Sequence, residues 1–295
     1  MKGEHEIKFR KNHRKTIVPA TTRKSVPISK PVEKDGAPEE VAALARGLTV
    51  LRRVASADAP ISNRELAELT GIPKPTVSRL TATLVKAGFL FQLPDSERFV
   101  LTASVLELSN GFLRNFDIRA RARPFLVDLA DRTALSVHLV TRDRLDMVVI
   151  EAVRPSSALL VSRLEIGSRM DLTRTAAGHA YLAALTALQR EALMTGVQAA
   201  AGDDWPHVHA RVAHALAQTD KNGFAIETGA WSAGLNAIAA GFVGPSGERY
   251  AVNCGGAAHL CTREWLLEHA APALVGCVAK IVREIGGAPR LRLSE

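Results

Sequence analysis

The segment from Ser62 to Ala87 constrains the fold of this chain more than any other. It reads SNRELAELTGIPKPTVSRLTATLVKA, two stretches with apolar residues at helical spacing on either side of a glycine. Ser62 and Glu65 are spaced for a capping box, in which each side chain accepts a hydrogen bond from the other's backbone N–H. Gly71 suits the left-handed conformation that commonly ends a helix. The pattern predicts two helices joined by a tight turn.

Each predicted helix has an apolar and a polar side. Leu66 and Leu69 of the first are expected to face inward, as are Val77, Leu80 and Leu84 of the second. The outward side of the second helix is polar and basic and carries Lys74, Thr76, Ser78, Arg79 and Lys86. Such a pair is typical of a helix-turn-helix that reads the major groove of DNA. Most helix pairs with a glycine turn bind nothing, so the flanking segments must decide.

The flanks favour DNA binding. Apolar runs at 89–93 and 98–101 enclose a polar turn and predict a β-hairpin, the wing of a winged helix. Arg98 in this hairpin is expected to meet a phosphate. A helix over 41–55 precedes the motif, with an inward stripe of Leu44, Leu48, Leu51 and Val54. The sequence therefore predicts a winged helix-turn-helix over 41–101, whose expected DNA contacts are Lys74, Thr76, Ser78, Arg79 and Arg98.

The positive charge of the chain is concentrated towards the N-terminus. The formal net charge is +8, and residues 1–30 carry nine Lys or Arg against two Glu. Residues 42–101 carry eight Lys or Arg against five acids, while the remainder from 102 onward is nearly neutral. We predict a disordered basic tail over 1–40. Such a tail adds phosphate contacts to a DNA-binding domain, or it only aids solubility; the sequence leaves both open.

The rest of the chain alternates short strands and helices. A linker helix is expected within 102–118, followed by a second domain over 119–290. Its expected strands cover 136–141, 147–153, 159–164, 224–227, 235–243 and 249–254, and its expected helices cover 119–133, 175–185, 188–194, 206–221 and 265–285. Hairpins mixed with helices predict an α+β fold, an antiparallel sheet with helices packed on it.

Motifs for catalysis, cofactors and metals are poor. The run 229–234 resembles a nucleophile elbow but is one residue too long. His207, His209 and His214 have no carboxylate or thiolate obviously beside them, so we expect no metal and no cofactor. Cys254, Cys261 and Cys277 form no CxxC pair, which favours a reducing cytosolic compartment. They could bind metal or sense redox state, although buried small side chains are favoured. No apolar run approaches the roughly 18 residues of a membrane span.

Small and polar residues gather at the predicted strand and helix ends of the second domain. The run 176–178 opens a helix, and the free N–H groups there would favour an anion. Glu227, Trp231, Asn236 and Asn253 lie on or beside strand ends, and the glycines at 255–256 would let a ligand approach the backbone. Together they could line a small-molecule pocket. The alternative is ordinary core with turn glycines.

The order of these parts resembles the IclR family of bacterial transcription regulators, from about Ala42 to Gly287. The N-terminal match lies in ALARGLTVLRRVASADAPISNRELAELTGIPKPTVSRLTATLVKAGFL. The second domain matches in GSRMDLTRTAAGHAYLAAL, in GLNAIAAGFVGPSGE after the Gly-Phe at 223–224, and in NCGGAAHLCTREWL. Each piece is moderately specific, and their shared order strengthens the resemblance.

The resemblance implies a winged-helix domain, a linker helix and a GAF-like effector-binding domain. It also implies a cytoplasmic homodimer or tetramer that binds palindromic operator DNA and is switched by a small organic effector, commonly an acid. With Trp231 added from the strand-end cluster, the expected effector-binding residues are Met170, Ala176, Ala177, Glu227, Trp231, Ala237, Asn253 and Gly255. We expect no enzymatic activity. The rivals are an enzyme that uses the second domain, and an architectural DNA-binding protein without a ligand.

Overall fold

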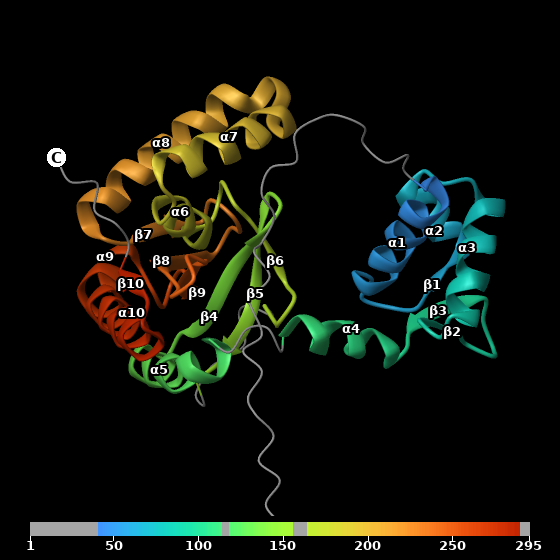
Figure 1. Cartoon of the computed structure of the whole chain (residues 1–295), viewed down its shortest axis with the longest axis horizontal. Coiled ribbons are helices and arrows are strands. Elements are labelled where there is room, and N and C mark those ends of the chain that lie inside the picture. Colours follow the sequence, from blue (N-terminus) through green and yellow to red (C-terminus); the bar gives the residue numbers. More distant parts are fainter. Residues whose placement is uncertain (1–40, 114–117, 156–163, 290–295) are drawn as a thin grey trace, which may run out of the picture. The chain divides into compact units, whose positions relative to one another are not determined.

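A computed structural model describes residues 41–113, 118–155 and 164–289. The predicted tail over 1–40 and all but the last residue of the predicted strand over 159–164 lie outside these ranges. The described chain separates into two compact units, divided between Thr102 and Ala103 (Figure 1). Each unit has its own sheet and its own core, and each is described by itself.

The first unit is a winged helix. Its helices are α1 (Ala42–Ala55), α2 (Asn63–Thr70) and α3 (Lys74–Lys86). Its small sheet has the order β1-β3-β2, with β1 (Ile61–Ser62), β3 (Arg98–Leu101) and β2 (Leu90–Gln92). The capping box of Ser62 and Glu65 is present, and Gly71 ends α2 with a φ of 69°. The predicted helix-turn-helix and its hairpin wing are therefore confirmed, and β1 adds a third strand to the wing.

Three leucines that we expected in the core of this unit are on its surface. Leu44 is 63% exposed, Leu48 is 47% exposed and Leu69 is 56% exposed. The core is built instead from Val50 and Val54 of α1, packed with Leu66, Val77 and residues of the wing. Helical spacing shows that a helix has an apolar side. It does not show which part of that side the neighbouring elements cover, and here α2 and α3 cover only the second half of α1 closely.

The second unit is built on a seven-stranded sheet in which every recorded pairing is antiparallel. Its strands are β4 (Ser136–Asp143), β5 (Asp146–Val153), β6 (Arg169–Asp171), β7 (Ala225–Thr228), β8 (Leu235–Val243), β9 (Arg249–Ala257) and β10 (Ala288–Pro289). The order is β10-β8-β9-β4-β5-β6, and β7 pairs with β8. The predicted α+β class, with an antiparallel sheet in the second unit, is confirmed.

Helices cover both faces of this sheet (Figure 1). On one face α5 (Ile118–Thr133) and α10 (Ala271–Ile285) pack together, and α10 contacts β8. On the other face α6 (Ala176–Ala183) lies against β8 and β9, with α8 (Trp205–Asn222) and α7 (Ala187–Ala201) outside it. The remaining helices are α4 (Ser104–Leu113), the short α9 (Arg263–Trp265) and a π-helical turn over Leu266–Ala270. The two faces thus have separate cores.

Sequence reasoning missed the short strands. β1, β6 and β10 have only two or three residues each. They are defined by their pairing with β3, β5 and β8, respectively. Alternation over so few residues gives no periodic signal, so tertiary pairing alone defines these strands.

The helical segment Arg263–Ile285 has the length and apolar composition of a membrane span, although the sequence alone predicted no such segment. Eight residues of α10 are buried, and they belong to the core between α10, α5 and the sheet. Its apolar character is therefore accounted for by packing. The three cysteines are also buried in this core, and burial raises the pKa of the Cys254 and Cys277 thiols to about 12. They act as small core residues.

Candidate DNA-reading helix and ligand cavity

The polar side of α3 is presented to solvent. Arg79, Ala82 and Lys86 are exposed and recur at i, i+3 and i+7, so they share one face. The opposite side is held by Val77 and Thr81, both buried, and the Thr81 hydroxyl lies 2.9 Å from Oδ1 of Asn63 at the start of α2. This contact helps to set the angle at which α3 projects from the helix pair.

The predicted DNA contacts lie in different surroundings. Lys74 and Arg79 are exposed, while Thr76 and Ser78 are half-buried. Thr76 and Arg79 also line a groove between α3 and α1. These four side chains therefore do not share a single outward face, and their contacts with DNA stay predictions. Ala82 and Lys86 lie beside Arg79 on the face that is fully open.

Arg98 is engaged within the fold. Its guanidinium donates to the carbonyl oxygen of Pro60 at 2.6 Å and to the Glu65 carboxylate at 3.1 and 3.2 Å. Glu65 also accepts hydrogen bonds from Ser62, and these bonds, with Arg98 adding to them, hold the pKa of Glu65 below its usual range. Arg98 therefore ties the wing to the start of α2, and a phosphate would have to compete with Glu65 for it.

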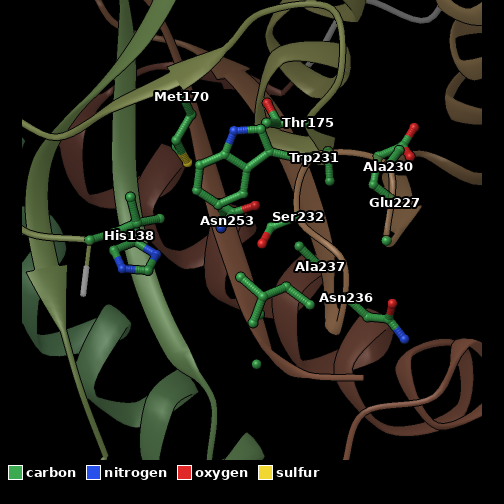
Figure 2. A pocket seen from close by; sticks show the side chains of 16 residues that line it. His138, Met170, Thr175, Glu227, Ala230, Trp231, Ser232, Asn236, Ala237 and Asn253 are labelled. Atoms are coloured by element: carbon green, nitrogen blue, oxygen red, sulfur yellow. The ribbon is translucent and has the colours of Figure 1, made fainter. Parts of the chain in front are cut away.

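A cavity opens on the face of the large sheet that α6 covers in the second unit (Figure 2). It contains about 490 Å³ of space free of protein atoms, part of it open to solvent. Its walls come from β4, β8, β9, the start of α6 and the loop that joins β7 to β8. The lining residues are His138, Leu164, Met170, Thr175, Ala176, Glu227, Gly229, Ala230, Trp231, Ser232, Leu235, Asn236, Ala237, Asn253, Gly255 and Gly256.

Seven of the eight predicted effector-binding residues line this one cavity. They are Met170, Ala176, Glu227, Trp231, Ala237, Asn253 and Gly255. Ala177 is fully buried and is not among the lining residues. Figure 2 shows the Trp231 indole at the centre of the group, between Met170 and Asn253. The structure thus brings together residues that are up to 85 positions apart in the chain.

The start of α6 forms one wall of the cavity. Thr175 caps the helix: its hydroxyl accepts the N–H of Gly178 at 3.1 Å and donates to the carbonyl of Asp171 at 2.7 Å. One of the N–H groups expected to attract an anion is therefore already bonded. A Cβ on Gly178 would lie 1.9 Å from the carbonyl oxygen of Leu172, so only glycine allows this close approach.

Glu227 is the only acid among the described residues that line the cavity. Its Oε1 lies 3.0 Å from Nδ1 of His179, a fully buried histidine on α6. Nε2 of His179 lies 2.9 Å from the carbonyl oxygen of Thr173. These contacts join β7, α6 and the segment before α6, although Nδ1 of His179 does not have hydrogen-bond geometry towards Glu227.

Sequence reasoning missed several lining residues, and His138 is the one among them with a titratable side chain. It lies on β4, is only 2% exposed, and neither of its ring nitrogens has a hydrogen-bond partner of normal geometry among the described residues. Burial, together with the positive charge of Arg154, lowers its pKa from 6.5 to about 4, so its ring is neutral at physiological pH. The available signal was a histidine between the apolar residues Val137 and Leu139 of β4, on the same side as Val140.

An exposed recognition helix and a separate domain with a polar-lined cavity define a class of DNA-binding regulators that carry a ligand-binding domain. The model of the bacterial transcriptional regulator IclR C-terminal domain matches residues 110–283, and that of the IclR helix-turn-helix domain matches residues 43–94. The chain therefore belongs to the IclR family of transcription regulators. Proteins of this family bind DNA and are not enzymes, which sets aside the enzymatic alternative.

Individual relatives agree with this assignment. The HTH-type transcriptional regulator TsaQ1/TsaQ2 of Comamonas testosteroni is 34% identical over 251 residues, which cover 84% of this chain and 90% of the relative. An IclR family transcriptional regulator from Brucella abortus is 33% identical with a TM-score of 0.72, covering 87% of this chain and 96% of that one. An IclR homologue from Microbacterium hydrocarbonoxydans, solved with 4-hydroxybenzoate, is 17% identical with a TM-score of 0.65 and covers 83% and 99%. The last likeness shows the fold alone.

Proposed function

We propose that this regulator binds a palindromic operator as a homodimer or tetramer in the cytoplasm, and that a small organic effector in the cavity switches its affinity for that operator. The observation that carries this proposal is the pairing, on one chain, of an exposed basic α3 with a cavity that gathers seven predicted effector residues. Two copies of α3 in successive major grooves would impose two-fold symmetry on the operator.

We assign sequence reading to the exposed face of α3. Arg79 can form a bidentate contact with guanine, and Ala82 can pack on a thymine methyl group, while Thr76 and Ser78 are further candidates for base edges. Lys74 and Lys86 would contact phosphates, which position the protein without reading sequence. Because Arg98 is bonded to Glu65, we propose that its main role is to hold the wing against the start of α2.

The effector assignment rests on the cavity and on the family. Family resemblance implies organic acids, and the Microbacterium homologue was solved with an aromatic acid. The cavity offers a flat indole, the Met170 side chain and several polar groups, a combination that suits a small ring-bearing molecule.

Strand β4 offers a physical connection from the cavity to α5, the helix that follows the linker. His138 faces the cavity, and the next residue, Leu139, belongs to the core on the other face. Glu151, the cross-strand partner of Leu139, is buried and binds Arg119 at 3.2 Å and Arg123 at 2.6 Å on α5. An effector that shifts β4 would move this anchor and so bias the populations of two linker arrangements.

The test of DNA binding uses the full-length protein and fluorescence anisotropy with DNA from upstream of the neighbouring genes. Arg79→Ala should cost about 1–3 kcal/mol on the operator and little on unrelated DNA. Lys74→Ala should weaken both and reduce the salt dependence. Arg98→Ala is the comparison: a loss equal to that of Lys74→Ala would return Arg98 to the phosphate contacts. No preference of the native protein for any upstream DNA would overturn the proposed function.

A further inference from the structure

The unpaired histidine in the cavity is the feature that most needs explanation. A buried polar atom without a hydrogen bond is costly, and in native proteins such atoms are few. His138 is 2% exposed, and neither ring nitrogen has a hydrogen-bond partner of normal geometry among the described residues; the backbone of Leu164 is near enough to raise its pKa slightly but does not offset burial. It lines the cavity rather than a packed interior, so a molecule that enters the cavity can supply the missing bonds.

A second polar group stands beside it. Asn253 on β9 is the direct cross-strand partner of His138 on β4, and it lines the same cavity. Directly paired residues of an antiparallel sheet point to the same face, with Cβ atoms about 5 Å apart. The amide of Asn253 can both donate and accept, as can a neutral imidazole. The two side chains therefore form a compact site with donors and acceptors but no charge.

The charges around this site disfavour an anion. None of the described lining residues is a lysine or an arginine, and the one charged lining residue is the acid Glu227. Two nearby cations do not line the cavity: Nη2 of Arg154 lies 3.3 Å from Oε1 of Glu165, and Nη2 of Arg174 donates to the carbonyl oxygen of Ala230 at 2.6 Å. Among the described lining residues a carboxylate at His138 would find no cation to replace its hydration, and buried charges without partners are strongly disfavoured.

The remaining walls are apolar and suit a ring. Trp231 and Met170 lie close together in Figure 2, and Leu235 and Ala237 on β8 also line the space. Neutral His138 accepts from a hydroxyl or donates to a carbonyl without needing a counter-ion. Such a wall with a few convergent polar groups is the usual composition of a site for a small uncharged molecule.

We propose that His138 and Asn253 recognise the effector, and that they select an uncharged ring-bearing molecule with a hydroxyl or carbonyl group over its carboxylate counterpart. This inference rests on the proposed function, since it takes the cavity to be the effector site. For this chain it replaces the organic acid that the family resemblance implies with an uncharged molecule.

Matched pairs of probes test the selection. Benzyl alcohol is compared with benzoate, and 4-hydroxybenzaldehyde with 4-hydroxybenzoate, by titration calorimetry on the full-length protein at about pH 7.5. The uncharged member of at least one pair should bind at least about tenfold more tightly than its carboxylate. Equal or tighter binding of the carboxylate overturns the proposal, and so does the failure of every probe to bind.

Variants then test the two residues. His138→Leu and Asn253→Leu should each weaken binding of the preferred probe by about tenfold, whereas His138→Gln, which keeps a donor and an acceptor, should lose less. His207→Leu, on the exposed side of α8, is the matched control and should bind like the native protein. A probe that binds equally well to native protein and His138→Leu overturns the role of His138.

Operator binding, measured in parallel, separates this inference from the proposed function. If the native protein binds its operator and a probe releases or strengthens it, the proposed function holds whichever member of a pair is preferred. If His138→Leu binds operator DNA normally but no longer responds to the probe, both hold. Loss of operator binding by His138→Leu would show a structural role for His138 instead and would overturn the inference alone.

Discussion

The two faces of the large sheet are packed in different ways. The face under α5 and α10 is closed by large apolar side chains, among them Leu126, Phe242 and Leu274, all fully buried. The face under α6 carries small residues and polar ones, including His138 and Asn253, and it contains the cavity. Among the described residues, three of the four buried polar side-chain atoms without a partner belong to His138 and His179 on the cavity side, and the fourth is Nε of Arg119 on α5. The contrast indicates that stability and ligand recognition are assigned to opposite sides of one sheet.

Leucine truncation should show the largest difference between the faces. Leu274→Ala, in the closed core, should lower the free energy of unfolding by about 3–5 kcal/mol because it creates a cavity that the packed neighbours cannot fill. Leu235→Ala borders existing space and should cost about 1 kcal/mol. Urea denaturation of the two variants measures both values. Equal costs would mean that the cavity face is as tightly packed as the closed one.

Adding a methyl group should have the opposite pattern: it should destabilise the cavity side and not the side of α10. Gly178→Ala places a Cβ against the Leu172 carbonyl on the cavity side and should cost about 3 kcal/mol, because α6 must move away from the segment before it. Gly276→Ala on α10 meets nothing within 4 Å and is the matched control. It should stabilise by up to about 1 kcal/mol through helix propensity. A cost below about 1 kcal/mol for Gly178→Ala would show that α6 is not held at this distance.

Acid should weaken the native protein through His138. Its pKa is 6.5 when unfolded and about 4 when folded, so below about pH 6.5 the unfolded chain takes up a proton that the folded protein does not. The free energy of unfolding should therefore fall by about 3 kcal/mol from this group as the pH drops towards 4, with no further loss below. Denaturation of native protein and His138→Leu across this range isolates the difference. Parallel pH profiles would contradict a buried neutral His138.

The two buried histidines should respond oppositely to the same substitution. His179→Leu should cost about 1–3 kcal/mol, because it leaves the Thr173 carbonyl without its partner and removes the 3.0 Å contact between Nδ1 and Glu227. His138→Leu should leave the unliganded protein equally stable or more stable by up to about 1 kcal/mol, since it removes two unpaired nitrogens. Thermal and urea unfolding at about pH 8 compare them. A large loss for both would show that His138 has partners in the free protein.

Local structure was predictable wherever nearby residues decide it. The capping box of Ser62 and Glu65, the end of α2 at Gly71 and the bounds of β8 follow from interactions within a few residues or from clear alternation. The reading of Leu44 and Leu48 as core was wrong, because exposure depends on neighbours that the spacing does not specify. His138 escaped notice for the same reason, since an unpaired ring is recognised only when its surroundings are known.

The sequence by itself determined the class of fold, the helix-turn-helix and most of the residues that line the cavity. Those properties depend on short-range hydrogen bonding, on periodicity and on resemblance to a family. Tertiary structure alone decided that Arg98 is bonded to Glu65, that Ala177 lies outside the cavity and that His138 faces it without a partner of normal geometry among the described residues. Each of these depends on atoms brought together from distant parts of the chain, where burial and missing partners, rather than residue type, set the chemistry.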